Sequence, residues 1–302
     1  MTKSTYVLSR RDFLKLAGVG TASAVWLVSC GPSGGAAGRP IKIGYVSPQT
    51  GPLAPFGEAD AFIVNAMKTV LADGISIGGT THPIEILVKD SQSDPNHAAE
   101  VAADLILTDN IDLMLVASTP ETTNPVSDQC EVNGVPCIST VAPWQPWYIG
   151  RQADPSGPPD TWKPFNFTNH FFWGLEDIIA VFTAMWASVD TNKTVGGMWP
   201  NDGDGLAWSS PQVGFPPALE AGGYKIVDPG RYENLKDDFS AELSRFKDEG
   251  VEIVTGVMIP PDLGTFIHEV LDKFSDNLEK ERVEWKDLNE DYAKESISMI
   301  VD

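Results

Sequence analysis

Apolar residues recur along this chain with two different periods, and the clearest change between them lies in residues 41–60. Residues 41–46 are mostly β-branched or aromatic, and residues 47–57 are rich in glycine and proline. From residue 59 to residue 71 apolar residues recur at steps of three and four, which places them on one face of a helix. The pattern predicts a strand, a loop and an amphipathic helix whose apolar face covers a sheet.

The same alternation continues as far as residue 148. It predicts strands at 84–88, 111–117 and 135–140, a helix that starts at Asp94 and Pro95, a second helix over 125–132, a turn cluster at 73–81 and a loop at 118–124. Asp accepts hydrogen bonds from the free N–H groups of a helix start, and Pro fits the first helical position. Strands that alternate with helices are typical of a parallel sheet, so we predict a doubly wound α/β lobe over residues 41–148.

A proline-rich stretch from residue 143 to residue 164 interrupts this rhythm and predicts a connection rather than an element, with the crossover itself at 149–172. A second α/β lobe is predicted over residues 173–275. Its predicted helices are 175–189 and 236–248, residues 206–221 are predicted as a loop that leads into a helix, and its predicted strands are 194–199, 225–227 and 251–258.

The composition changes again near the C-terminus. No glycine or proline follows Gly264, and residues 276–302 are dominated by charged side chains with a thin apolar seam. This pattern predicts a solvated, charged helix. The segment is either an unusual C-terminal helix or the end of a truncated or altered form of a longer protein, and the pattern does not choose between them.

The N-terminal residues are predicted to be a targeting segment. Residues 1–29 contain an arginine pair in S-R-R-D-F-L-K followed by an apolar stretch too short to span a bilayer, which resembles a twin-arginine export signal. The sequence L-V-S-C that ends at Cys30 resembles a bacterial lipobox, whose cysteine is lipidated. Residues 30–40 then form a flexible, glycine-rich tether. We therefore expect a lipoprotein on the outer face of the bacterial cytoplasmic membrane; the alternative is a buried N-terminal helix with a chance arginine pair.

The overall charge excludes one class of partner. The 302 residues include 42 Asp and Glu against 21 Lys and Arg. Nucleic-acid binding is driven chiefly by Lys and Arg, so no nucleic-acid partner is expected.

Motifs for catalysis, metals and cofactors are weak in this chain. Residues 74–78 match G-x-S-x-G, but a nucleophile elbow follows a strand and opens a helix, whereas Ser76 lies where an ordinary loop after a helix is expected. The four histidines are scattered, and the N-D-G-D-G of residues 201–205 lacks the terminal Glu of a calcium loop. No dinucleotide or P-loop pattern follows a strand. We expect no enzyme, no metal and no cofactor.

Loops at the carboxyl ends of the predicted strands mix hydroxyl groups, glycine, proline and aromatic rings. They span residues 47–57, 118–124, 140–148, 199–204 and 260–262. Ligands of open α/β sheets bind at this edge, and pockets lie preferentially between domains. The candidates that this placement gives are Ser47, Ser118, Thr140, Trp144, Trp199 and Asp202. For Trp144 the alternative is a hydrophobic lid on the first lobe. Cys130 and Cys137 form either a disulfide or two separate buried thiols, since spacing alone does not decide.

A family resemblance covers about residues 41–266. The opening I-K-I-G-Y-V-S-P-Q-T-G-P-L-A-P-F-G, the later T-N-P-V-S-D and G-V-P-C-I-S, and G-V-E-I-V-T-G-V-M-I-P-P-D resemble the extracytoplasmic solute-binding proteins of ABC importers, type I, in the branched-chain amino-acid and amide group. The resemblance implies two Rossmann-like, doubly wound lobes joined by crossover strands. It also implies that the lobes close on a ligand by a hinge motion and that the closed form docks on a membrane permease.

The resemblance also implies roles for particular residues. Phe56 corresponds to an aromatic residue against the ligand, Thr122 and Thr123 to the loop that holds a ligand carboxylate, and Thr140 and Ala142 to the next ligand-facing loop. Residues 166–168 depart from the arginine-containing strand of the family. Family members also continue beyond the length of this chain, where the acidic residue that often pairs a ligand ammonium is expected, so the second lobe and the crossover are predicted to be incomplete.

Three functions are compatible with these features. The first is a lipid-anchored binding protein that captures a small polar solute, amino-acid-like or an amide, without catalysis. The second is a ligand sensor of the same fold that signals to a partner. The third is a secreted hydrolase that uses Ser76.

Overall fold

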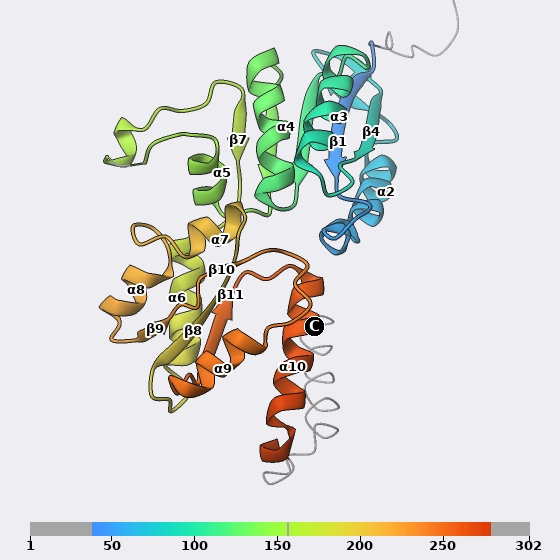
Figure 1. The fold of residues 1–302 in the computed structure, drawn as a ribbon. Helices are drawn as coiled ribbons and strands as arrows, with labels where there is room; N and C mark the ends of the chain where they lie inside the picture. Colours follow the sequence, from blue (N-terminus) through green and yellow to red (C-terminus); the bar gives the residue numbers. More distant parts are fainter. Residues whose placement is uncertain (1–37, 156, 279–302) are drawn as a thin grey trace, which may run out of the picture.

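The described residues form two α/β lobes (Figure 1). The computed structural model describes residues 38–155 and 157–278, so the predicted signal peptide, Cys30 and the charged segment beyond residue 278 lie outside it. Lobe 1 contains β1 (Ile41–Ser47), the 3-10 turn η1 (Ala54–Gly57), α2 (Asp60–Val70), β2 (Ile75–Ile77), β3 (Thr80–His82), β4 (Ile84–Asp90), α3 (Pro95–Leu107), β5 (Leu113–Ala117), α4 (Pro120–Asn133), β6 (Cys137–Thr140), α5 (Trp144–Gly150), the 3-10 turn η2 (Pro159–Thr161) and β7 (Thr168–His170). Lobe 2 contains α6 (Leu175–Trp186), β8 (Thr194–Pro200), α7 (Gly203–Trp208), α8 (Phe215–Ala221), β9 (Lys225–Val227), β10 (Arg231–Tyr232), α9 (Ser240–Asp248), β11 (Ile253–Gly256) and α10 (Pro260–Leu278).

Each lobe is built on one parallel sheet. The strand order in lobe 1 is β4-β1-β5-β6-β7, and in lobe 2 β8 lies between β11 on one side and β9 and β10 on the other. Because all pairings in these two sheets are parallel, every strand of a lobe ends at the same edge. The predicted α/β class is confirmed.

Two helices of lobe 1 differ from the prediction. Helix α4 begins at Pro120 and not at residue 125, because Thr119 has the extended conformation of an N-cap and Pro120 fills the first helical position. Pro125 lies inside the helix, and most of the loop predicted at 118–124 is therefore helical. Residues 144–150, predicted as part of a connection, form α5.

One face of the lobe 1 sheet is closely packed by α3 and α4. Helix α3 begins as predicted, since Asp94 Oδ1 accepts the N–H of His97 at 2.7 Å and Pro95 is its first residue. The residues buried on this face come from β1, β5, β6 and the two helices, and include Val46, Ala98, Leu105, Met114, Val116, Val126 and Cys137. This is the hydrophobic core of lobe 1.

The opposite face of the same sheet is only partly covered among the described residues. Helix α2 was predicted to cover it, but no residue of α2 is buried, and Phe62 is 75% exposed. On this face Leu115 is 36% exposed and Ile138 is 52% exposed. A hollow of about 220 Å³ lies between α2 and the sheet, lined mainly by apolar side chains that include Ile43, Tyr45, Met67, Ile86, Leu115 and Ile138. The predicted apolar stripe is present, but its coverage of the sheet is incomplete.

Lobe 2 is packed on both faces of its sheet. Helices α6 and α8 pack on one face around Phe215, and α9 and α10 pack on the other around Phe239. Every residue of β8 is buried. The lobe therefore has the two-sided cover that a short parallel sheet requires.

The lobes meet where α4 and α5 of lobe 1 approach α7 of lobe 2. Gly203 N donates to Glu121 Oε1 at 3.0 Å, and a side chain at Gly203 would come within 3.1 Å of Pro120 Cβ. Helix α4 follows β5 and α7 follows β8, so this contact brings the strand-end edges of the two sheets face to face (Figure 1).

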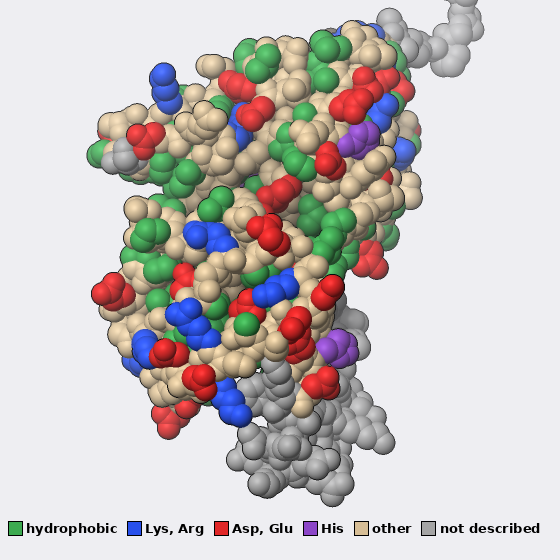
Figure 2. All heavy atoms as spheres, in the orientation of Figure 1, with side chains coloured by type: hydrophobic (Ala, Val, Ile, Leu, Met, Phe, Trp, Pro, Cys, Tyr) green, Lys and Arg blue, Asp and Glu red, His purple; other side chains and the backbone are tan. Residues whose placement is uncertain are grey.

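Three carboxylates gather at this α4–α7 contact. Burial raises the pKa of Glu121, and the charge of Asp202 raises it further. Asp204 is buried, and the charges of Glu121 and Asp202 add to the burial that raises its pKa well above the usual value. Figure 2 shows acidic side chains on both lobes, including the region where the lobes meet. The contact is therefore electrostatically unfavourable when all three groups are ionised.

We predict unequal effects of truncating two neighbouring residues of β5. Met114 is fully buried in the lobe 1 core, whereas Leu115 points to the partly covered face. Met114→Ala should lower the free energy of unfolding by about 2–5 kcal/mol, and Leu115→Ala by about 1 kcal/mol or less. Urea denaturation of the two variants measures the difference. Equal losses would mean that the second face is covered.

The carboxylates at the α4–α7 contact predict a pH dependence of stability. A pKa that is higher in the folded state stabilises the fold at low pH, and this contribution is lost as the pH rises through the raised pKa. Glu121→Gln keeps an acceptor for Gly203 N but removes one charge. Its melting temperature should exceed that of the wild type by an amount that grows from about pH 4 to about pH 8.

Glu220→Gln, at an exposed position of α8, is the matched control and should follow the wild type. Thermal unfolding followed by circular dichroism measures all three proteins. A Glu121→Gln curve parallel to that of the wild type would contradict the electrostatic account of the contact.

Candidate functional site

Strained backbone marks the edge where the strands end. Among the described residues, eight residues other than glycine have a positive φ, and five of them lie in loops that follow strands: Gln92 and Ser93 after β4, Ser118 after β5, Val141 after β6 and Leu235 after β10. A β-branched residue such as Val141 rarely adopts φ of 80°. Such strain is concentrated at functional sites in proteins. It therefore supports the predicted location of the site.

The loop after β1 forms one wall of this edge and is rigidly held. Asp90 accepts hydrogen bonds from Gln49 N at 2.8 Å and Thr50 Oγ1 at 2.6 Å. Burial alone would raise the pKa of Asp90, but these bonds and those from neighbouring N–H groups outweigh it and lower the pKa. A hollow of about 420 Å³ lies between this loop and α2, with Gln49, Gly57, Asp60 and Asn65 among its lining residues.

Ser47 and Phe56 belong to the same wall. Ser47 is buried, and its hydroxyl donates to Asp60. Phe56 lies in η1 and is 40% exposed. The structure therefore leaves the ring of Phe56 accessible, whereas the hydroxyl of Ser47 is engaged within lobe 1.

Three of the predicted residues lie on adjacent strands at one edge. The register pairs Val46 with Val116 and Ala117 with Thr140, so Ser47, Ser118 and Thr140 are neighbours across β1, β5 and β6. Ser118 is 1% exposed, and its Oγ has no hydrogen-bond partner in the part of the chain that the structure describes. The hydroxyl of Thr140 donates to the carbonyl of Phe171 at 2.6 Å.

Thr122, Thr123 and Ala142 are less accessible than the sequence suggested. Thr122 and Thr123 lie in the first turn of α4 and are buried, rather than in an open loop. The hydroxyl of Thr123 donates to the carbonyl of Thr119 at 3.2 Å. Ala142 is fully buried, and its carbonyl accepts from His170 Nε2 at 2.6 Å. These contacts stabilise the strand-end edge from within lobe 1.

Trp199 lies near the end of its strand, as predicted, although β8 extends one residue further, to Pro200. Its ring is fully buried in the lobe 2 core, 5.7 Å from the ring of Phe215. The side chain is therefore closed to solvent in this structure.

Asp202 and Trp144 lie near the lobe junction but are occupied by structural contacts. Asp202 is the N-cap of α7: its Oδ1 accepts from Gly205 N at 2.8 Å and its Oδ2 from Asn234 Nδ2 at 2.7 Å. This capping explains the N-D-G-D-G pattern. The Trp144 ring lies 5.1 Å from that of Trp162, and its indole N–H donates to a carboxylate of lobe 2, which agrees with the lid alternative.

Several residues of lobe 2 present buried polar atoms without a partner among the described residues, and two of them, Asp262 and Tyr232, were not among the predicted candidates. Asp262, in the first turn of α10, is 1% exposed; its Oδ2 accepts from Leu235 N at 3.2 Å, and its Oδ1 has no partner within residues 38–155 and 157–278. The hydroxyl of Tyr232 is buried and is also unpaired there. Asp262 belongs to the loop at 260–262, which was predicted to line the site. Tyr232 could not be identified from the sequence, because β10 is only two residues long and gives no periodic signal.

The charge of Asp202 acts on both groups. Burial is the largest cause that raises the pKa of Asp262, opposed in part by bonds from Leu235 N and Lys236 N, and Asp202 raises it further. Burial and then the charges of Asp262 and Asp202 raise the pKa of Tyr232. This wall of lobe 2 therefore carries a carboxyl group and a phenol hydroxyl. This wall can therefore accept hydrogen bonds from a ligand group that donates them.

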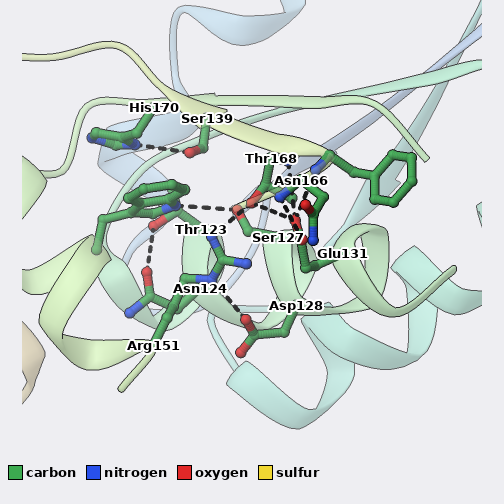
Figure 3. Close-up of polar contacts among 12 residues, drawn as sticks. Thr123, Asn124, Ser127, Asp128, Glu131, Ser139, Arg151, Asn166, Thr168 and His170 are labelled. Carbon is green, nitrogen blue, oxygen red and sulfur yellow. Dashed lines mark hydrogen bonds and ion pairs between the residues drawn. The ribbon is translucent and has the colours of Figure 1, made fainter. Parts of the chain in front are cut away.

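A polar network behind lobe 1 holds the crossover strand β7 in place (Figure 3). Arg151 donates to Asp128 Oδ1 at 2.6 Å and to Thr168 Oγ1 at 2.9 Å, and its guanidinium lies 3.7 Å from the ring centroid of Phe165. The carboxylate of Glu131 accepts the N–H groups of residues 166–168, and these bonds outweigh burial and lower its pKa. The crossover therefore has a fixed attachment to lobe 1.

The remaining candidate motifs do not form a catalytic or metal centre. Ser76 lies in β2 and pairs with Thr81 of β3, so the predicted turn cluster is a hairpin and lacks the strand-to-helix turn of a nucleophile elbow. No group of three His, Cys, Asp or Glu residues that could hold a metal ion is found in the described ranges. Within the same ranges, no helix has the length and apolar character needed to cross a bilayer.

Cys130 and Cys137 are both buried in the lobe 1 core, at the end of α4 and at the start of β6, and are unbridged in the structure. Their thiols are hydrogen-bonding neighbours, so the two cysteines are brought together. The disulfide stays a prediction.

Comparison with solved structures shows where this fold occurs. The chain is similar to a type 1 periplasmic binding protein from Bordetella pertussis Tohama I, with a TM-score of 0.62 and 20% identity over 79% of this chain and 60% of that one. It is also similar to a solute-binding protein of an ABC transporter from R. palustris in complex with 4-hydroxybenzoate (TM-score 0.60, 18% identity, 80% of this chain and 59% of that one). A third similar structure is a solute-binding protein of an ABC transporter from Rhodopseudomonas palustris BisB5 in complex with 3,4-dihydroxybenzoic acid. It has a TM-score of 0.58 and 18% identity, and the match covers 78% of this chain and 58% of that one. The chain thus spans a little over half of these structures.

Curated relatives match only a short stretch. One component of the ATP-dependent helicase/deoxyribonuclease from Clostridioides difficile is 51% identical over 43 residues, and its counterpart from Acetivibrio thermocellus is 49% identical over 43 residues. In both cases the match covers 14% of this chain and 4% of the relative. A match of this extent carries no conclusion about the fold of the two lobes.

The family match is much longer. Residues 40–274, which include both lobes and their crossover, match the periplasmic binding protein family. The facing sheets and the arrangement of the lobes agree with this match. The chain therefore belongs to the periplasmic binding protein family.

Proposed function

We propose that this protein captures a small polar solute, an amino acid or an amide, between its two lobes and delivers it to the permease of an ABC importer. The family membership supports a binding role without catalysis. The amino-acid or amide class is supported by the chemistry of the two walls, described next. Two of the similar solved structures hold hydroxybenzoates, so aromatic acids are the natural comparison set.

The observation that carries the proposal concerns two of the unpaired polar groups on lobe 2. Asp262 Oδ1 and the Tyr232 hydroxyl are buried without a hydrogen-bond partner among the described residues. An unpaired buried polar group costs about 1–3 kcal/mol, so such groups mark places where a partner binds. A solute that donates hydrogen bonds through an ammonium or amide nitrogen would satisfy Asp262.

Lobe 1 supplies the complementary groups. Ser118 Oγ is unpaired within the described residues and lies at the edge that faces lobe 2, beside the N-terminus of α4. A helix N-terminus and a hydroxyl both favour a carboxylate or carbonyl oxygen. The ring of Phe56 offers an accessible apolar surface nearby in the loop after β1. A solute with a nitrogen donor at one end and an oxygen acceptor at the other fits this polarity.

The proposed location of the protein follows from its N-terminal residues. Residues 1–29 resemble an export signal and Cys30 the lipidated residue of a lipobox, and residues 31–38 provide a glycine-rich tether to the folded lobes. We place the protein on the outer face of the cytoplasmic membrane, held there by lipid.

A thermal-shift screen tests the proposal. The purified protein is heated with amino acids, primary amides, urea, short organic acids and hydroxybenzoates. An amino acid or amide should raise the melting temperature, because a solute at 100 times its Kd stabilises the folded state by about 2.7 kcal/mol. Asp262→Asn and Tyr232→Phe should each weaken the binding of that solute about tenfold or more, measured by isothermal titration calorimetry.

Asp237→Asn is the matched control, because Asp237 is an exposed carboxylate of the loop that follows Tyr232. It should bind the solute as tightly as the wild type. Stabilisation by hydroxybenzoates alone would contradict the proposed solute class. Unchanged affinity in both Asp262→Asn and Tyr232→Phe would remove lobe 2 from the site.

A further inference from the structure

The β2–β3 hairpin, residues 74–83, lies at the end of the lobe 1 sheet where the strands begin. Strands β2 and β3 pair with each other in antiparallel fashion and form a two-stranded sheet of their own. Pro83 separates β3 from β4, whose first residue, Ile84, is paired with Ile41 at the start of β1. In Figure 1 this end of β1 lies away from lobe 2. The hairpin is therefore at the other end of the sheet from the proposed solute site.

The hairpin is exposed and yet carries no charged side chain. Residues 74–84 contain no Lys, Arg, Asp or Glu. Ile75 is 40% exposed and Ile77 is 54% exposed. Gly78 and Gly79 form the turn with positive φ, and a Cβ added to either would meet no other residue within 4 Å in the part of the chain that the structure describes. The turn therefore projects from the body of lobe 1.

Both isoleucines lie on one face of the hairpin. Side chains two residues apart on a strand point to the same side, and so do the residues paired directly opposite them. The register pairs Ile75 with His82 and Ile77 with Thr80, so these four side chains share a face. The apolar surface of the hairpin is therefore concentrated on one side.

The chain that comes from Cys30 reaches lobe 1 beside this face. The N–H of Gly38 donates to the carbonyl of Thr81 at 2.8 Å, and His82 Nδ1 lies 3.0 Å from the carbonyl oxygen of Arg39. The ring of His82 is so close to Gly38 that a Cβ there would lie 2.5 Å from it. Because His82 shares its face with both isoleucines, the N-terminal chain is attached to the hairpin on its apolar side.

The spacing between Cys30 and Gly38 limits how far the hairpin can lie from a bilayer that holds Cys30. Eight residues span at most about 28 Å even when fully extended. A tether raises the effective concentration of a binding group at the surface, so a contact that is weak by itself becomes sufficient. Two isoleucine side chains provide such a contact, because apolar side chains that enter the headgroup region leave water.

Electrostatic attraction to lipid headgroups does not explain such a contact. The chain contains 42 Asp and Glu against 21 Lys and Arg. Two basic side chains near the start of β1 are engaged within lobe 1: Arg39 pairs with Asp112 at 2.7 Å, and Lys42 Nζ donates to the carbonyl of Asp109 at 2.7 Å. The contact would therefore depend on the isoleucines and not on anionic lipid.

We propose that the β2–β3 hairpin is a membrane-contact site, in which Ile75 and Ile77 enter the headgroup region of the bilayer that anchors Cys30. The inference rests on the proposed location of the protein. It goes beyond that location by assigning the surface of lobe 1 that meets the bilayer. The strand-end edge, with the proposed solute site, is then directed away from the bilayer.

Hydrogen–deuterium exchange on vesicles tests the contact. The chain from Cys30 onward is coupled through the Cys30 thiol to a maleimide phospholipid in phosphatidylcholine vesicles, so the test does not depend on whether cells lipidate this residue. Cys130 and Cys137 are buried and do not compete for the maleimide. The reference is the same protein in solution with Cys30 capped by N-ethylmaleimide. Mass spectrometry compares amide exchange in residues 74–83 and in residues 187–193 of lobe 2.

Exchange of the hairpin amides should slow about fivefold or more on the vesicles, because amides held in the headgroup region are shielded from water. Exchange in residues 187–193 should not change. Ile75→Ser combined with Ile77→Ser should remove the protection of the hairpin. Val181→Ser, at an exposed position of α6, is the matched control for loss of an apolar surface side chain and should behave as the wild type.

Equal exchange of the wild-type hairpin on vesicles and in solution would overturn the membrane contact. Protection that persists in the double variant, or that extends to residues 187–193, would also overturn it, because the protein would then adsorb to lipid without the two isoleucines. The proposed location has its own test, the mass of the N-terminal peptide of protein extracted from cell membranes. An unmodified Cys30 would contradict the anchoring alone.

Discussion

Parallel strand pairing is the constraint on which the rest of this structure depends. A parallel strand needs a crossover before the next one can begin, so the loops that follow the strands of a sheet all emerge at one edge. The contact between Glu121 and Gly203 then brings the strand-end edges of the two sheets face to face. Ser118 of lobe 1 and Asp262 of lobe 2, which are far apart in the sequence, each follow the carboxyl end of a strand in their own sheet.

The two lobes are joined through several helices, since α4 and α5 of lobe 1 both contact α7 of lobe 2. Hydrogen bonds of a buried glutamine and of Glu176 fix α5 to α6. At the contact of α4 with α7, burial and neighbouring charges raise the pKa values of Glu121 and Asp204. Asp202 also raises the pKa of Asp262, the carboxyl group that we propose accepts a solute nitrogen.

Much of the fold could be predicted from the sequence, because its strands are strongly apolar and its helices are periodic. Asp94 and Pro95 start α3 as expected. The start of α4 could not be predicted as well, since both Pro120 and Pro125 are acceptable first residues and only the conformation of Thr119 decides between them. The stripe on α2 shows that the helix has an apolar partner, but periodicity does not show how much of the sheet it covers.

The site was harder to predict than the fold. Sequence position identified the edge and the loops at 118–124 and 260–262, but not which side chains are free. Trp199 lies near its strand end as predicted, but its ring is buried in the lobe 2 core, and the hydroxyls of Ser47 and Thr140 are engaged by Asp60 and Phe171. Such engagement depends on three-dimensional neighbours. Asp262 and Tyr232 become candidates only because the structure leaves their polar atoms without partners among the described residues.

The central claim is that a solute is held between the lobes, and small-angle X-ray scattering tests it most directly. Scattering is recorded from the protein alone and from the protein saturated with the solute that stabilises it. We predict a smaller radius of gyration in the saturated protein, because the solute bridges Ser118 and Asp262 and draws the lobes together. An unchanged radius of gyration at saturation would place the solute within a single lobe and contradict this account.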